Sequence, residues 1–172
     1  SLFYSATSLL LQSLPMGVAV RASTRVDSVE QFQFRMSRLN VQADGSGDVV
    51  GAVSVNGRPL EGTLQLPHSR LRPGVNTIAV QRSDASEAVR LYSSSAELYD
   101  CGVDDDAIVL AMSSAVACQL IFDNYERISA LRVTQNGKEL EYTVSAFNDT
   151  GKTVVYVEST GDFVVRVDTV AH

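Results

Sequence analysis

The chain has 172 residues, which is enough for one large or two small hydrophobic cores. Hydrophobic residues make up 45% of it and charged residues 20%, proportions that are typical of globular proteins and exclude a disordered chain. There are 14 Lys and Arg against 20 Asp and Glu, so the formal net charge is -6 and the pI is near 4.8. Because binding to a phosphate backbone needs clustered positive charge and the basic residues are scattered, we expect no nucleic-acid partner.

The most apolar part of the chain is its N-terminal segment, residues 2–20. Ser and Thr residues and Pro15 interrupt it, so no run reaches the roughly 18 apolar residues that a membrane span needs. It also lacks the positively charged start of a signal peptide. Residues 5–14 are compatible with one short helix that Pro15 would end. We favour instead a strand pair that is buried or bound to a partner.

Beyond this segment the periodicity is that of β-strands. Residues 29–36 read VEQFQFRM and alternate, with Phe32, Phe34 and Met36 on one face. Further short runs rich in β-branched or aromatic residues lie at 77–80, 88–92, 108–112, 118–122, 153–157 and 163–167. Short strands at intervals of about ten residues predict a sandwich or a barrel.

An internal similarity suggests duplication. Residues 53–64 read VSVNGRPLEGTL, and residues 133–144 read VTQNGKELEYTV. Weaker agreement follows between residues 74–80 and residues 151–157. In each copy Asn-Gly predicts a tight hairpin, because a type I′ turn needs positive φ at both central positions. Two unrelated hairpins with this turn would also look alike, but the number of matches favours a true repeat.

We therefore expect an all-β protein of two tandem, duplicated antiparallel β-sandwich units, either Ig-like or jelly-roll-like. The predicted boundary lies at residues 99–106, where YDCGVDDD interrupts the strand pattern. It divides the chain into residues 1–100, which include the apolar N-terminal segment, and a shorter unit of residues 101–172. A strand from the N-terminal segment or from another molecule would complete the shorter unit.

No residues form a recognisable catalytic constellation. His68 and His172 are the only histidines, and the sequence has no Gly-x-Ser-x-Gly nucleophile elbow. A thiol nucleophile would need Cys101 or Cys118 beside His68, across the predicted boundary. We therefore expect no catalytic residues and no enzyme activity. The two cysteines are compatible with one disulfide in an oxidising compartment or with two buried free thiols.

Two acidic segments are candidate Ca²⁺ ligands, because hard oxygen atoms suit this ion. Asp104, Asp105 and Asp106 are consecutive, so their side chains diverge in an extended chain, and we interpret them as a solvated linker. Asp44 and Asp48 flank a Gly-Ser-Gly stretch, which we interpret as a flexible hairpin loop. Neither has the spacing of an EF-hand loop, so we expect no metal and no cofactor.

Two further residues are candidate ligand or modification sites. Trp is absent, and Tyr125, in the turn Asp123-Asn-Tyr-Glu, is the tyrosine best placed for contact with a ligand such as a glycan. Asn148 opens the triplet Asn-Asp-Thr, which is an N-glycosylation sequon.

One stretch resembles a known group of modules. Residues 53–84, VSVNGRPLEGTLQLPHSRLRPGVNTIAVQRSD, resemble galactose-binding-like jelly rolls of glycoside hydrolases, in which an Asn-Gly hairpin precedes a strand with a Pro-Gly turn. Macroglobulin-type and other secreted β-sandwich modules show a similar pattern. The resemblance implies a β-sandwich in an extracellular or enzyme-accessory context, and it transfers no ligand residue.

Two functions agree with these features. The first is a non-catalytic structural or interaction protein, a subunit or module of an extracellular, cell-surface or virion assembly that self-associates through its N-terminal strand. The alternative is a carbohydrate-binding or accessory domain of a polysaccharide-active enzyme.

Overall fold

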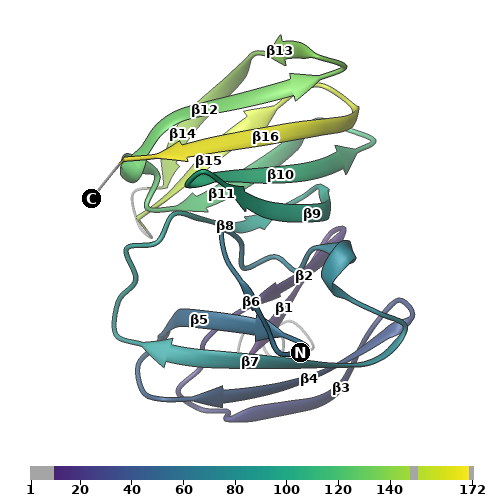
Figure 1. The fold of residues 1–172 in the computed structure, drawn as a ribbon, viewed down its shortest axis with the longest axis vertical. Helices are drawn as coiled ribbons and strands as arrows, with labels where there is room; N and C mark the ends of the chain where they lie inside the picture. Colours follow the sequence, from purple (N-terminus) through teal and green to yellow (C-terminus); the bar gives the residue numbers. More distant parts are fainter. Residues whose placement is uncertain (1–9, 148–150, 171–172) are drawn as a thin grey trace.

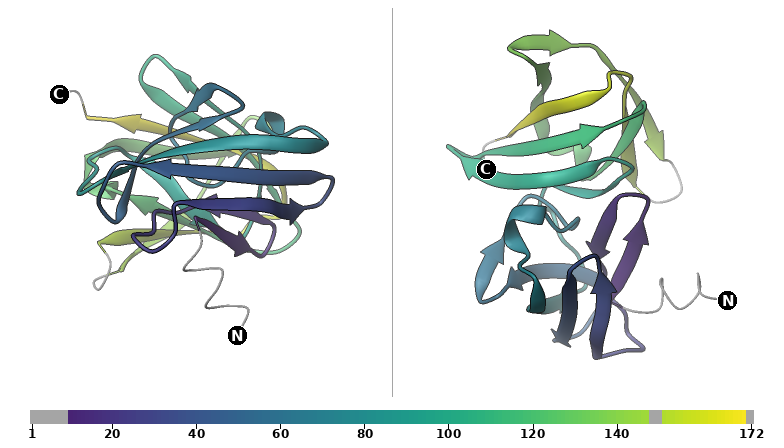
Figure 2. Two further views of the ribbon diagram at one scale, coloured as in Figure 1. Left: turned by 90° about the horizontal axis from the view of Figure 1, so that it is seen from below. Right: turned by 90° about the vertical axis from the view of Figure 1, so that its right-hand side faces the viewer.

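The computed structural model describes residues 10–147 and 151–170, which form two lobes stacked along the long axis of the molecule (Figure 1; Figure 2). Its regular structure consists of strands in four sheets, with two short 3₁₀ turns, η1 (His68–Arg70) and η2 (Tyr125–Arg127). The all-β prediction is confirmed. The favoured strand pair in the N-terminal segment is present among the described residues, since residues 11–14 and 17–20 are paired strands, and the alternative of a helix over residues 5–14 is wrong there.

The first lobe contains a five-stranded sheet and a hairpin. The sheet has the order β3 (Ser28–Phe34), β4 (Ser37–Asp44), β7 (Gly74–Ser83), β5 (Val49–Val55) and β6 (Arg58–Leu60). The hairpin consists of β1 (Leu11–Leu14) and β2 (Gly17–Val20), and its apolar residues join the core of this lobe. Residues 10–20 are therefore not a detachable strand, because Leu10 and Leu11 are fully buried.

One pair of strands in this sheet departs from the predicted antiparallel arrangement. β4 pairs in parallel with β7, whereas β5 pairs antiparallel with the other side of β7. The loop from Asp44 to Asp48 therefore crosses the end of β7 and does not close a hairpin. Gly47 (φ 111°) lies so close to Ser83 that a Cβ would stand 2.1 Å from the Ser83 carbonyl oxygen.

The second lobe is a two-layered β-sandwich. One layer has the order β13 (Lys138–Leu140), β12 (Ile128–Gln135), β16 (Gly161–Thr169), β10 (Ala107–Ser114) and β9 (Glu97–Asp104). The other has the order β14 (Tyr142–Phe147), β15 (Lys152–Val157), β11 (Cys118–Asp123) and β8 (Arg90–Ser94). Alternate side chains from both layers, among them Leu110, Phe122, Val155 and Val165, fill a common core.

The division between the lobes falls earlier than residues 99–106. β8 and β9 pair with β11 and β10, and the second core begins at Val89. The acidic run is the tip of the β9–β10 hairpin and not a linker, because Asp105 (φ 47°) and Asp106 (φ 65°) take the two left-handed positions of the turn. The chain passes between the lobes between Ser83 and Arg90.

The two Asn-Gly hairpins of the internal similarity are present. β5–β6 and β12–β13 turn at Asn56-Gly57 and Asn136-Gly137, with positive φ at all four residues. The similarity between residues 74–80 and 151–157 is not accompanied by similar strand pairing. β7 neighbours β5, whereas β15 lies in the layer opposite β12. Duplication of the whole unit is not confirmed and stays a prediction.

Residues 62–66, which we call the seam strand, connect the sheets of the two lobes. On one side, Leu64 O accepts from Val20 N (2.7 Å) and Leu66 N donates to Val18 O (2.9 Å). On the other side, Leu64 N donates to Leu91 O (2.8 Å) and Gly62 O accepts from Leu91 N (2.9 Å). The seam strand thereby extends the pairing from β2 in the first lobe to β8 in the second.

The side chain of Gln65 also connects the seam strand to the second lobe. The side chain is completely buried; its Nε2 donates to Ala96 O (3.1 Å), and its Oε1 accepts from Ser94 Oγ (2.7 Å). Gly17 allows this placement, since a Cβ there would stand 3.0 Å from Gln65 Nε2. A buried amide with its donor and acceptor both engaged holds one lobe in a single register against the other.

We expect Gln65→Ala to lower the free energy of unfolding by about 1–3 kcal/mol, because Ala96 O and Ser94 Oγ lose their buried partner. Gln119→Ala, on an exposed position of β11, is the matched control and should change it by less than about 0.5 kcal/mol. Urea titration of both variants measures the difference, and equal effects would contradict a special role for Gln65.

Candidate functional site

The two cysteines are free thiols, so the disulfide alternative is wrong. Cys101 lies on β9 and Cys118 on β11, in opposite layers of the sandwich. Burial raises the pKa of the Cys101 thiol to about 12, and its Sγ lies 3.4 Å from Glu61 O. Burial also raises the pKa of Cys118. Thiols kept protonated in this way are poor nucleophiles.

Tyr125 does not form an exposed platform. It lies in η2, is half-buried, and packs against the core of the second lobe, which raises its pKa through desolvation. Two tyrosines in the described ranges are more exposed, Tyr99 on β9 and Tyr156 on β15. The predicted glycosylation site at Asn148 lies outside the described residues. Within the described residues no group of three or more acidic, His or Cys side chains is placed to hold a metal ion.

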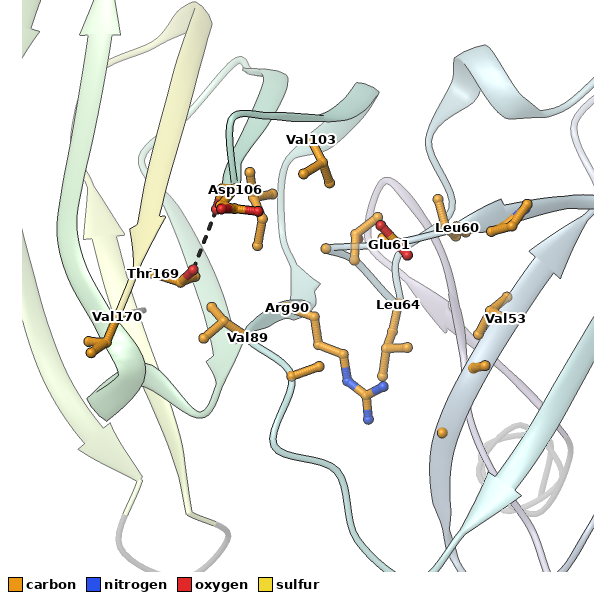
Figure 3. Close-up of a pocket in the computed structure, with 17 residues that line it drawn as sticks. Val53, Leu60, Glu61, Leu64, Val89, Arg90, Val103, Asp106, Thr169 and Val170 are labelled. Carbon is orange, nitrogen blue, oxygen red and sulfur yellow. Dashed lines mark hydrogen bonds between the residues drawn. The ribbon is translucent and has the colours of Figure 1, made fainter. Parts of the chain in front are cut away.

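Sequence reasoning missed a cleft between the lobes, the interlobe cleft (Figure 3). It has a volume of about 590 Å³, and the ends of β9 and β16 line it on one side and β5, β6 and the start of the seam strand on the other. Its apolar lining includes Val53, Leu60, Leu64, Val89, Val103 and Val170. Half the side chain of Val103 and of Val170 is exposed there, at 51% and 52%.

Two carboxylates and one guanidinium supply the charge of the interlobe cleft. Glu61 and Asp106 are exposed on its opposite walls, and neither forms an ion pair with any residue that the structure describes (Figure 3). Arg90 also lines the cleft, but its Nε lies 3.1 Å from Asp123 Oδ2, which neutralises it. The interlobe cleft is therefore apolar with an acidic rim, and it suits a neutral polar or a cationic ligand.

A second cluster lies at the other end of β9, where it meets the first lobe. Glu97 on β9 accepts a hydrogen bond from Arg35 Nη2 (2.6 Å) at the β3–β4 turn and another from the Tyr99 hydroxyl (2.5 Å). His68 of η1 stacks on Phe34, with centroids 6.1 Å apart, and meets Tyr99 edge-on. The cluster connects three segments that are far apart in the sequence.

The pKa values of His68 and of Glu97 are both lowered in this cluster. Burial, followed by the nearby Arg35 cation, lowers the pKa of His68, against the opposing effect of Glu97. His68 Nε2 is buried without a hydrogen-bond partner in the described ranges, 4.0 Å from Glu97 Oε1. The hydrogen bonds from Tyr99 and Arg35 lower the pKa of Glu97. His68 thus packs between aromatic side chains, and burial disfavours its charged form by lowering its pKa.

We expect the lobe contact to weaken in acid. Because the pKa of His68 is lower in the folded protein than its ordinary 6.5, its contribution is complete above pH 6.5 and is lost as the pH falls below that value. The free energy of unfolding should therefore decrease from pH 7.5 to pH 5.5 more in the wild type than in His68→Gln. Urea titrations at both pH values test this, and identical decreases in the two proteins would contradict it.

The edges of the sheets differ in how they are protected against pairing with another chain. β6 and β13 have three residues each and β1 has four. β3 has a bulge at Gln31 (φ 59°). β9 carries three carboxylates and is partly covered by η1, where Ser69 Oγ donates to Asp100.

β14 is the exception among these edges. It spans six residues, Tyr-Thr-Val-Ser-Ala-Phe, without a charge or a proline, and pairs with β15 without a bulge. Tyr142, Val144 and Ala146 point to the same side as the fully buried Val155 and Val157, since they are their register partners or neighbours. Val144 is nevertheless 45% exposed, because β13 opposite is too short to cover it. The uncharged run was visible in the sequence, but its position at an edge was not.

No family model, curated protein or solved structure matches the chain. In the described ranges no helix has the length and apolarity that a membrane crossing requires.

Proposed function

We propose that this chain is a non-catalytic structural or interaction module that self-associates within an extracellular, cell-surface or virion assembly. The observation that carries the proposal is the free edge of β14, which offers the outward-pointing backbone groups of a six-residue strand and exposed apolar side chains in a molecule whose other edges are short, bulged or charged. Backbone hydrogen bonds along a free edge give affinity without a preformed pocket. The extracellular context of the proposal rests on the sequence resemblance, and the virion alternative rests on the predicted tandem sandwich without catalytic residues.

The N-terminal contribution to this function is limited to residues 1–9. Four residues that follow this segment are buried in the core of the first lobe and therefore do not contact another subunit: Leu10, Leu11, Val18 and Val20. Residues 1–9, Ser-Leu-Phe-Tyr-Ser-Ala-Thr-Ser-Leu, contain no charged side chain, and the proposal assigns the N-terminal subunit contact to them.

We expect the mass of the full chain in solution to rise with concentration when it is measured by light scattering. A strict monomer over the accessible range would contradict self-association. Deletion of residues 1–9, which stops before the core residue Leu10, should lower the mass at a given concentration while the unfolding transition is retained. An unchanged mass would remove the N-terminal segment from the proposal.

The interlobe cleft favours a second candidate function, carbohydrate binding as an independent or accessory domain. Its two carboxylates, Glu61 and Asp106, lie on opposite walls of a largely apolar cleft and have no ion-pair partner in the described part of the chain. Carboxylates in such a position accept hydrogen bonds from sugar hydroxyl groups.

We expect Glu61→Gln combined with Asp106→Asn to abolish any glycan signal of the wild-type chain on a broad array, because amides accept these hydrogen bonds less strongly. The matched control is Glu30→Gln with Asp48→Asn, two exposed carboxylates outside the cleft. A wild-type chain without signal, or a cleft variant that binds like the control, would contradict this candidate.

A further inference from the structure

We infer that β14 pairs with β14 of a second copy of this chain around a two-fold axis at Val144. This inference rests on the proposed self-association and specifies its site. The pairing joins the four-stranded layers of two second lobes into one eight-stranded antiparallel sheet.

Charge decides which partner fits this edge. Two copies of a chain with net charge -6 repel each other, and a two-fold axis brings the same strand of both copies together, so its charges lie near charges of the same sign. Pairing of β9 with β9 of a second copy would bring Glu97, Asp100 and Asp104 close to the carboxylates of the other strand. β14 carries no charged residue, so it is the long edge on which two copies meet without this repulsion.

The ends of the strand add an attractive contribution. Glu141 precedes β14 and is exposed, whereas Lys152 on β15 is the register partner of Phe147 at the other end. Antiparallel pairing of two β14 strands directs Glu141 of each copy toward the Lys152 end of the other. Lys152 already lies 3.6 Å from Asp123, and the second carboxylate would extend this row of charges.

The alternation of the strand fixes the register. Residues opposite each other in a sheet point to the same face, so the inward-facing Tyr142, Val144 and Ala146 must oppose one another. With Val144 on the axis, Val144 faces Val144 of the second copy and Tyr142 faces Ala146. The large ring is then opposite the small side chain, and the exposed inner face of each strand is covered by the other.

Mutation of the residue on the axis tests the pairing in the full chain. Val144→Lys should raise the dissociation constant of self-association by about tenfold or more, because two ammonium groups then face each other. The control is Val164→Lys: Val164 has a similar exposed fraction (39% against 45%), but it lies on β16, whose two edges are both occupied. Analytical ultracentrifugation gives the constants, and circular dichroism shows whether each variant is folded.

Cross-linking provides a readout that does not depend on destabilisation. Val144→Cys should form a disulfide-linked dimer under mild oxidation, whereas Ser145→Cys should not, because Ser145 lies opposite Thr143 of the second copy and not opposite itself. The native thiols of Cys101 and Cys118 are buried and serve as the background in the wild type.

The outcomes separate this inference from the proposed function. A wild-type chain that does not associate overturns both. Association that survives Val144→Lys unchanged, without a Val144→Cys cross-link, overturns the β14 interface alone. A cross-link through Ser145→Cys in place of Val144→Cys overturns the register with Val144 on the axis.

Discussion

The arrangement of the whole molecule depends on backbone pairing of the seam strand with both lobes. Leu64 donates to Leu91 of β8 through its N–H and accepts from Val20 of β2 through its carbonyl. A connection through a flexible linker alone would leave the relative position of the lobes open. Because backbone hydrogen bonds on both of its sides fix distance and register, the seam strand sets the position of β8 and thereby the walls of the interlobe cleft.

The polar residues in the seam make this connection specific. Gln65 is fully buried, and Arg21 of the first lobe is nearly fully buried. The Arg21 guanidinium donates to Tyr92 O (2.9 Å), and its central carbon lies 3.6 Å from the centroid of the Tyr92 ring. Burial lowers the pKa of Arg21, because desolvation disfavours its charged form. Close packing adds a steric constraint, since a Cβ on Gly62 (φ 86°) would stand 2.8 Å from Ile108. A shifted register would leave these groups buried without partners. The polar contacts therefore act more by excluding other registers between the lobes than by adding stability.

Local features of the sequence were read correctly and long-range ones were not. The strands followed from alternation, and both Asn-Gly turns have the positive φ values that their sequence requires. The lobe division was misplaced because Asp105-Asp106 is an unusual pair for a tight turn and is more typical of a linker. The parallel β4–β7 pair, the seam strand and the interlobe cleft depend on which strands become neighbours, and periodicity within a strand carries no information about neighbours.

The sequence also does not reveal which strands lie at the edges of the sheets, and the proposed function depends on one of these edges. A run such as that of β14 would be unremarkable in a central strand, where both sides are paired and the inner face is covered. It acquires meaning only because β13 is short, which leaves Val144 exposed on the side of the core. The protection of β3 by a bulge and of β9 by carboxylates shows that this chain does contain the usual devices against edge pairing. Their absence from β14 is therefore a local property of one edge, and that edge is where association with another chain has the lowest electrostatic cost.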